Sequence, residues 1–535
     1  MLRLPYRELP VENPGEPDRR SPFAYLRWLA WHQKWLLLGN ATFGVGWMLC
    51  MALLWAAVGA GIDKGVAHHN PHALVTWGFV VLGLGMVQAF CGAMRHQLAV
   101  TNWMTATYRT IQLIGRRIST AGTALTDAIP SGDVVNTVAA DAMRIGGAFD
   151  VFARFTGAVV SWLVVAFILL STSLTLGLIV LLGVPILASL TTPLMKPLHA
   201  TQAAQREVAG RLAALGSDTV TGLRILRGIG GEDVFFNNYQ TQSRRVRLAG
   251  NRVANPQAGL ESGQILLPAI LTTLVTFFGS HAVMNGTLQP GQLIAFFGYA
   301  NFLTTPLRTA IEYVISTTRA YVGAGKVLRI LNVIPHVSDP ATPLPWPETV
   351  TEVRDEVTGV TVRAGEFVAL VTETPAEATA VVDRLGRFVA DDEGVSVNGR
   401  PIDQYALADV RRSIVVSEIE PRIFSGLLRG ELDPHGQADD DQLRGALATA
   451  SALDVLEGLE DGFDTWVEER GRSFSGGQRQ RLSLVRALLA QADVLLLVEP
   501  TSAVDTHTEG RIATRLRAHR AGGSTLVATT SPCLL

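Results

Sequence analysis

The stretch "SFSGGQRQRLSLVRALLAQADVLLLVEPTSAVD", Ser473 to Asp505, decides how this chain is interpreted. Its first half places a serine and two glycines ahead of an amphipathic segment with helical spacing. Its second half contains "ADVLLLVEP", an apolar run bounded by a charge and a proline, which is typical of a strand buried in a parallel sheet. A similar run, "STLVATT", follows later. Helical stretches between buried strands predict an α/β fold with a parallel sheet.

The bulk composition indicates that another part of the chain lies in a membrane. Of 535 residues, 48% are hydrophobic and only 17% are charged, whereas soluble domains carry about 25% charged residues. The net charge of −2 argues against a nucleic-acid-binding protein. The three cysteines show no metal-site or disulfide spacing, so no metal site is predicted. The polar N-terminus does not resemble a cleavable signal peptide.

Apolar stretches of about 20 residues mark the membrane crossings. The uncharged run from Phe155 to Met195 is twice the length that one helix needs, and the polar knot Ser171–Thr175 is the natural turn. In the last crossing, Arg308 and Glu312 lie one helical turn apart and could pair, or could contact a substrate. The six predicted crossings are Leu36–Ile62, Ala73–Met94, the two halves of Phe155–Met195, Gly263–Met284 and Gln292–Ile315.

The basic residues predict the orientation and the domain boundaries. Arginines are concentrated in the long connections after the second and fourth crossings, so these loops, the N-terminus and the C-terminal region are predicted to be cytoplasmic. Both loops show helical periodicity, which indicates that crossings two to five extend into the cytoplasm. We predict a cytoplasmic N-terminal segment (1–35), a transmembrane domain (36–330), a proline-rich linker (331–347) and a soluble domain (348–535).

Two motifs give the soluble domain a family resemblance. "SFSGGQRQR" followed by an apolar strand and "EPTSAVD" resembles the nucleotide-binding domain of ABC transporters. Six crossings with two long loops, then a linker and this domain, resemble a half-transporter of the exporter type. "PSGDVVNTVAADAMRI" from Pro130 is similar to the first coupling segment of these exporters. The resemblance implies an all-α six-helix transmembrane domain followed by an α/β P-loop-type nucleotide-binding domain, the ABC ATPase fold.

The family's phosphate-binding loop is altered in this chain. A Walker A loop, GxxxxGK[ST], wraps phosphates with glycine backbone N–H groups, contacts them with its lysine and holds Mg²⁺ with its hydroxyl. Counted from "GEFVALV", Thr372 and Glu377 occupy the glycine positions, Ala378 occupies the lysine position, and only Thr379 matches. Glu377 places a carboxylate where phosphate should lie, and like charges at close range repel.

The other catalytic positions are altered as well. The family's Walker B ends in Asp-Glu, where the Asp helps to hold Mg²⁺ and the Glu polarises the attacking water. Val498 stands at the Asp position, which leaves Glu499 as a vestigial base. The Q-loop glutamine falls on Ile419, or on Glu418 after a one-residue slip. The switch histidine falls on Thr530, or else on Thr529. We therefore expect this chain's own site not to hydrolyse ATP, and whether it holds a nucleotide stays open.

The signature motif is intact, and this implies a partner. In the family, two nucleotide-binding domains close face to face, and the signature of one contacts the ATP held by the other. Ser475, Gly476 and Gly477 would contact the γ-phosphate at a helix N-terminus, Gln478 would lie over the ribose, and Asp505 matches the D-loop. The expected assembly is a heterodimer, in which Mg-ATP is hydrolysed at the Walker site of a second half-transporter.

Several functional points stay open at this stage. The leading hypothesis is a multi-pass subunit of the plasma (inner) membrane that exports a small molecule, lipid or peptide, with loop tips near Ser131–Asp141 and Gly210–Gly231 transmitting closure. The alternatives are a regulatory or scaffold subunit, and a siderophore-type importer with an exporter fold. The chain ends at "TTSPCLL", before further family strands, so the soluble domain is expected to be abbreviated or truncated.

Overall fold

The computed structural model describes residues 11–389, 394–420 and 422–534, so the first ten residues of the predicted N-terminal segment lie outside it. The chain divides into two compact units. One comprises Met1–Thr120 and Thr126–Val333, and the other comprises Ala121–Leu125 and Ile334–Leu535. The boundary at residue 333 falls within the predicted proline-rich linker.

The first unit is helical, and its helix ends follow the polar breaks of the sequence. The chain turns at Ser173, inside the predicted knot, where the serine adopts an extended conformation and its hydroxyl accepts a hydrogen bond from Leu176 N. The helical elements are α1 (Pro22–His32), α2 (Lys34–Gly61), the π-helix η1 (Ile62–Val66), α3 (Pro71–Ala121), α4 (Thr123–Ala128), α5 (Ser131–Asn136), the π-helix η2 (Thr137–Asp141), α6 (Ala142–Thr172), α7 (Leu174–Thr221), α8 (Leu223–Ile229), α9 (Glu232–Met284), α10 (Pro290–Phe302) and α11 (Thr304–Leu331).

Within the described residues, three helical stretches have the length and apolar character of a membrane span: Lys34–Val66, Pro71–Ala121 and Ser131–Thr172. Two shorter apolar stretches, Leu174–Ile186 and Ala269–Met284, lie inside the much longer α7 and α9. The sixth predicted crossing corresponds to α10 and the start of α11. Each predicted crossing therefore lies on a helix, and several helices continue far beyond the apolar part.

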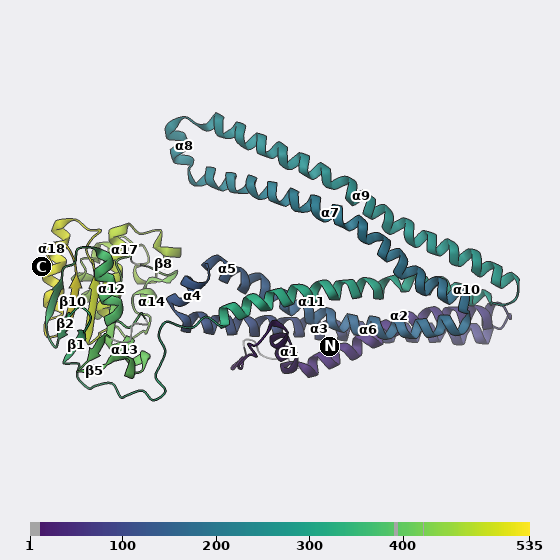
Figure 1. Cartoon of the computed structure of the whole chain (residues 1–535), viewed down its shortest axis with the longest axis horizontal. Coiled ribbons are helices and arrows are strands. Elements are labelled where there is room, and N and C mark those ends of the chain that lie inside the picture. Colours follow the sequence, from purple (N-terminus) through teal and green to yellow (C-terminus); the bar gives the residue numbers. More distant parts are fainter. Residues whose placement is uncertain (1–10, 390–393, 421, 535) are drawn as a thin grey trace. The chain divides into compact units, whose positions relative to one another are not determined.

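The long helices pack in two groups. The helix α6 packs against α2 and α11, whereas α7 packs along α9 (Figure 1). The short helix α8 connects α7 to α9. Glu312 of α11 pairs with Arg154 of α6 through two hydrogen bonds of 3.0 and 3.1 Å. Among the described ion pairs, none joins Glu312 to Arg308, so the partner of this glutamate lies across a helix interface and not on its own helix.

Among its described residues, the second unit contains two four-stranded sheets and a two-stranded sheet. Its strands are β1 (Glu352–Asp355), β2 (Thr361–Arg363), β3 (Phe367–Leu370), β4 (Val395–Val397), β5 (Arg400–Pro401), β6 (Ile414–Ser417), β7 (Gly426–Leu427), β8 (Trp466–Val467), β9 (Val494–Val498) and β10 (Ser524–Ala528). Its helices are α12 (Pro375–Leu385), η3 (Ile402–Gln404), α13 (Leu407–Ser413), α14 (Leu428–Leu432), α15 (Asp440–Thr449), α16 (Leu453–Glu457), η4 (Gly462–Asp464), η5 (Glu469–Gly471), α17 (Gly476–Leu489) and α18 (Thr506–His519).

The parallel sheet has the strand order β3-β10-β9-β6, and the two runs that predicted buried strands form its centre. Every residue of β9 and β10 is buried. Ala528 is in register with both Leu370 and Val498, so three strands end at the same level. The segments that follow these strands must therefore emerge side by side, which brings together motif positions that lie far apart in the sequence.

Candidate functional site

The segment after β3 contains the four predicted Walker A positions, and its hydroxyls bond to its own backbone. Thr374 caps α12, because its hydroxyl accepts a hydrogen bond of 3.4 Å from Glu377 N. The Thr372 hydroxyl donates to Thr374 O at 2.8 Å. The Thr379 hydroxyl donates to Pro375 O at 3.0 Å. Pro375 begins the helix and has no N–H to offer a phosphate.

The charge and burial of this segment are also unlike those of a phosphate site. Glu377 is exposed in the first turn of α12. Ala378 has only 4% of its surface exposed and packs in the core beneath the sheet. Burial and the negative charge of Glu418 raise the pKa of Asp383, further along α12. Ile419 packs against the same core. The first turn of α12 thus carries a carboxylate where an anion would need donors and cations.

Glu499 follows β9 in a left-handed conformation with φ of +44°. Its side chain is buried and bonds to the end of β10. One carboxylate oxygen accepts hydrogen bonds from the backbone N and the hydroxyl of Thr530, at 2.9 and 3.2 Å. The other accepts the Thr529 hydroxyl at 3.2 Å. Val498, just before it, has only 2% of its surface exposed, so its side chain points into the core.

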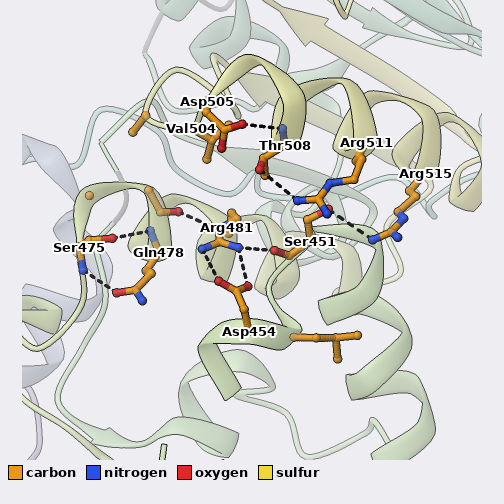
Figure 2. Close-up of a pocket in the computed structure, with 14 residues that line it drawn as sticks. Ser451, Asp454, Ser475, Gln478, Arg481, Val504, Asp505, Thr508, Arg511 and Arg515 are labelled. Carbon is orange, nitrogen blue, oxygen red and sulfur yellow. Dashed lines mark hydrogen bonds and ion pairs between the residues drawn. The ribbon is translucent and has the colours of Figure 1, made fainter. Parts of the chain in front are cut away.

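A second group of predicted residues lines a cavity of about 840 Å³ between α17 and α18 (Figure 2). Ser475 caps α17 by a capping box: its hydroxyl accepts from Gln478 N at 3.3 Å, and Gln478 Oε1 accepts from Ser475 N at 2.8 Å. A Cβ on Gly477 would lie 2.6 Å from Ala503 O, so the fold itself requires that glycine. A Cβ on Gly476 would meet no atom within 4 Å. Packing within this chain therefore does not explain why residue 476 is a glycine.

Asp505 lines the same cavity and caps α18, since its side chain accepts a 3.0 Å hydrogen bond from Thr508 N. Hydrogen bonds from the backbone and side chain of Thr508 lower the pKa of Asp505. The carboxylate is therefore ionised at neutral pH, and its position is fixed by the start of the helix.

Three arginines that the sequence prediction missed also line this cavity: Arg481, Arg511 and Arg515. Arg481 forms two hydrogen bonds to Asp454, at 2.6 and 3.0 Å. Arg515 donates to the Ser451 hydroxyl at 3.3 Å, and Arg511 donates to the Thr508 hydroxyl at 3.1 Å (Figure 2). The spacing of Arg511 and Arg515, one turn apart on the helix after "SAVD", was the available signal. The cavity presents a helix N-terminus and three arginines against the two aspartates Asp454 and Asp505, a balance that favours an anion.

Comparisons with known proteins cover both units. Residues 42–307 match the family model described as ABC transporter transmembrane region. Residues 357–502 match the model described as ABC transporter. An ATP-dependent lipid A-core flippase of Pseudomonas fluorescens (strain Pf0-1) is 27% identical over 69% of this chain and 64% of its own length.

Two further relatives resemble the chain to a similar degree. The ATP-dependent lipid A-core flippase of Hahella chejuensis is 26% identical over 59% of this chain and 57% of its own length. An ABC transporter ATP-binding protein, YwjA, of Bacillus subtilis (strain 168) is 25% identical over 59% of this chain and 58% of its own length. The chain thus spans less than two thirds of the length of these curated relatives.

Proposed function

The chain belongs to the ABC transporter family as a half-transporter of the exporter type, and from this premise we propose that it is the non-catalytic half of a heterodimer. The ATP that drives transport is held by the Walker motifs of a second subunit. Ser475, Gly476, Gly477 and Gln478 of this chain complete that site. Its own site, around Thr372–Thr379, does not hydrolyse ATP, and the protein lies in the inner membrane with its nucleotide-binding domain in the cytoplasm.

One observation carries the proposal: Gly476 lies in open space beside a cavity whose lining includes three arginines and two aspartates, whereas Ala378 is buried and Glu377 occupies the first turn of α12. A glycine that nothing in its own chain crowds is suited to close approach by something outside the chain. The segment Thr372–Thr379 is less suited to an anion, because it contains the Glu377 carboxylate and no lysine. The start of α17 is therefore a better anion-binding site than the start of α12.

The helical unit supports a second subunit as well. The helix α8 has no buried residue, although its sequence is rich in apolar side chains. Large apolar residues on α7 and α9 are exposed too, and contiguous apolar surface of this kind marks an interface with protein or membrane. The exposed set includes Val220, Leu223, Ile225, Ile229, Val234 and Phe236.

Lipid is the substrate class that we propose. Two of the named relatives are ATP-dependent lipid A-core flippases, and a membrane lipid can enter from the bilayer without crossing water. Export is the direction that we propose, in keeping with the exporter-type arrangement of the chain.

The test is a Gly476→Asp substitution in the complex of this chain with its partner half-transporter. The open space admits the side chain, so folding and assembly should persist. The added carboxylate should repel the γ-phosphate and lower the ATPase rate about a hundredfold, the scale for losing a transition-state contact. Gly510→Asp, at another glycine with no atom within 4 Å, is the matched control and should leave the rate unchanged.

Two outcomes would refute the proposal. One is unchanged ATPase and transport in the Gly476→Asp complex, which would leave this chain as a scaffold. The other is a stable complex of this chain alone that hydrolyses ATP, because that result would place a working catalytic site on its own Walker positions.

A further inference from the structure

A separate cavity of about 220 Å³ lies in the helical unit, between the C-terminal ends of α2 and α6 and the start of α10. Its middle is apolar and is lined by alanines and leucine, including Ala60 and Ala295. Asp63, Lys64 and Gln292 lie toward one end, and Tyr299 lies two helical turns further along α10. The volume is below the 300 Å³ or more of typical drug-sized sites, so it suits a small group.

The carboxylate of Asp63 is buried at one end of this cavity, with 4% of the residue exposed. It lies in the π-helical turn η1, a local irregularity that is frequent at functional sites. Its Oδ1 accepts a 2.6 Å hydrogen bond from Gly291 N, at the start of α10. Close packing fixes this geometry, because a Cβ on Gly291 would lie 2.1 Å from Gly59 O and 2.7 Å from the Asp63 carboxyl carbon.

No cation neutralises this carboxylate within the described part of the chain. Lys64 is adjacent in sequence, but its ammonium lies over the Trp77 ring, 5.3 Å from the centroid, and none of the described ion pairs joins it to Asp63. The N-terminus of α10 supplies only a partial positive charge. A buried carboxylate is costly unless it is paired, so a cation that reaches Asp63 would stabilise it.

The far end of the cavity is apolar. Tyr299 lines it with 2% of its surface exposed, and its hydroxyl is enclosed and does not open into the cavity. The cavity therefore offers a charged end at Asp63 and an apolar wall beyond it.

We propose that this cavity binds a small amphiphilic amine. The ammonium group pairs with Asp63, and a short apolar chain lies against Ala60 and Ala295. The amine is either the headgroup region of a membrane lipid or a soluble alkylamine, since both present the same chemistry. The inference rests on the helical unit alone and stands or falls independently of the asymmetric ATP sites.

The test measures binding of soluble probes to the full chain in nanodiscs made from lipids without amines. Hexylamine should bind, whereas hexanol and hexanoate should not. Asp63→Asn keeps an acceptor for Gly291 N but removes the charge, and should weaken hexylamine binding about tenfold or more. Tyr313→Phe, at a tyrosine whose ring stacks on Phe155 with the centroids 4.2 Å apart, is the control and should leave the affinity unchanged.

Ala60→Leu provides an independent variant, because it fills the cavity without touching a polar group and should abolish binding. Equal binding of hexanol or hexanoate, or unchanged affinity in Asp63→Asn, would overturn the proposal. A second arm adds phosphatidylethanolamine to the nanodiscs. Stabilisation that Asp63→Asn removes assigns the site to lipid headgroups, and binding of the soluble probe alone assigns it to a soluble amine.

Discussion

The helices α12 and α17 begin in the same way and end up with opposite surroundings. Each has a hydroxyl residue at its N-cap, Thr374 or Ser475, that accepts a hydrogen bond from the first turn. At α12 the next residues are a proline and the exposed carboxylate of Glu377, whereas at α17 they are two glycines. A helix N-terminus alone therefore does not make an anion site. The side chains of the first turn decide whether an anion can approach.

The two helices also differ in how they are anchored. Arg384 of α12 pairs with Asp355 of β1 at 2.6 Å, and that aspartate is fully buried. Arg481 of α17 pairs with Asp454 at 2.6 Å, but the aspartate side chain is 61% exposed. The helix that we infer to have lost its phosphate role is thus fixed by a buried ion pair. The first half of α17, which faces the proposed partner, is held by an exposed pair, whereas Arg486 near its end pairs with the buried Glu431.

The largest expected effect on stability comes from the buried pair. Asp355→Asn should lower the free energy of unfolding of the soluble domain by about 3 kcal/mol, because it leaves Arg384 without its counter-charge. Asp454→Asn, the matched change at the exposed pair, should cost less than about 1 kcal/mol. Chemical denaturation of the full chain, followed by a probe in the soluble domain, measures both. Equal losses of unfolding free energy in the two variants would contradict the proposed difference between the buried and the exposed ion pair.

The same pair predicts a pH dependence. Burial raises the pKa of Asp355, but hydrogen bonds from Arg384 and Thr358 outweigh it, and the pKa lies below its ordinary value. Because the folded-state pKa is lowered, the stability that ionised Asp355 contributes is complete above its unfolded-state pKa of about 3.9. It is lost as the pH falls through the folded-state value. The stability gap between wild type and Asp355→Asn should therefore be constant near neutral pH and narrow below about pH 4.

A smaller effect is expected when a lysine is put back at the Walker position. Ala378→Lys should destabilise the soluble domain by about 1–3 kcal/mol, because the larger side chain enters a packed core. It should not create nucleotide binding. Ala376→Lys, two residues earlier and exposed, should stay within about 0.5 kcal/mol of wild type. Binding of a fluorescent ATP analogue by Ala378→Lys would show that α12 can still act as a phosphate helix.

The smallest effect is expected at Glu499. Its carboxylate is already bonded to Thr529 and Thr530, so it joins the ends of β9 and β10 and is not free to orient a water. Glu499→Gln should leave the ATPase rate of the assembled complex within about twofold of wild type. A loss of ATPase rate comparable to that of Gly476→Asp would instead assign Glu499 a catalytic role.

The sequence predicted the fold class, and the two family matches confirm it. The local signals were strong where they depended on residues close in sequence: the turn at Ser173, the buried strands β9 and β10, and the start of a helix after Ser475. The arginines of the α17–α18 cavity were missed because charged residues on a helix surface are common. Their convergence depends on how α18 packs.

What the sequence by itself determined is the order of elements and the contrast between an intact and an altered motif, since both are written in adjacent residues. Only the tertiary structure decided that Glu499 contacts Thr530, that Ala378 is buried, and that Asp63 meets Gly291 across two helices. Each of these features depends on residues that lie far apart in the sequence, so no local pattern predicts it. They follow from strand register and close helix packing, which a single sequence does not display.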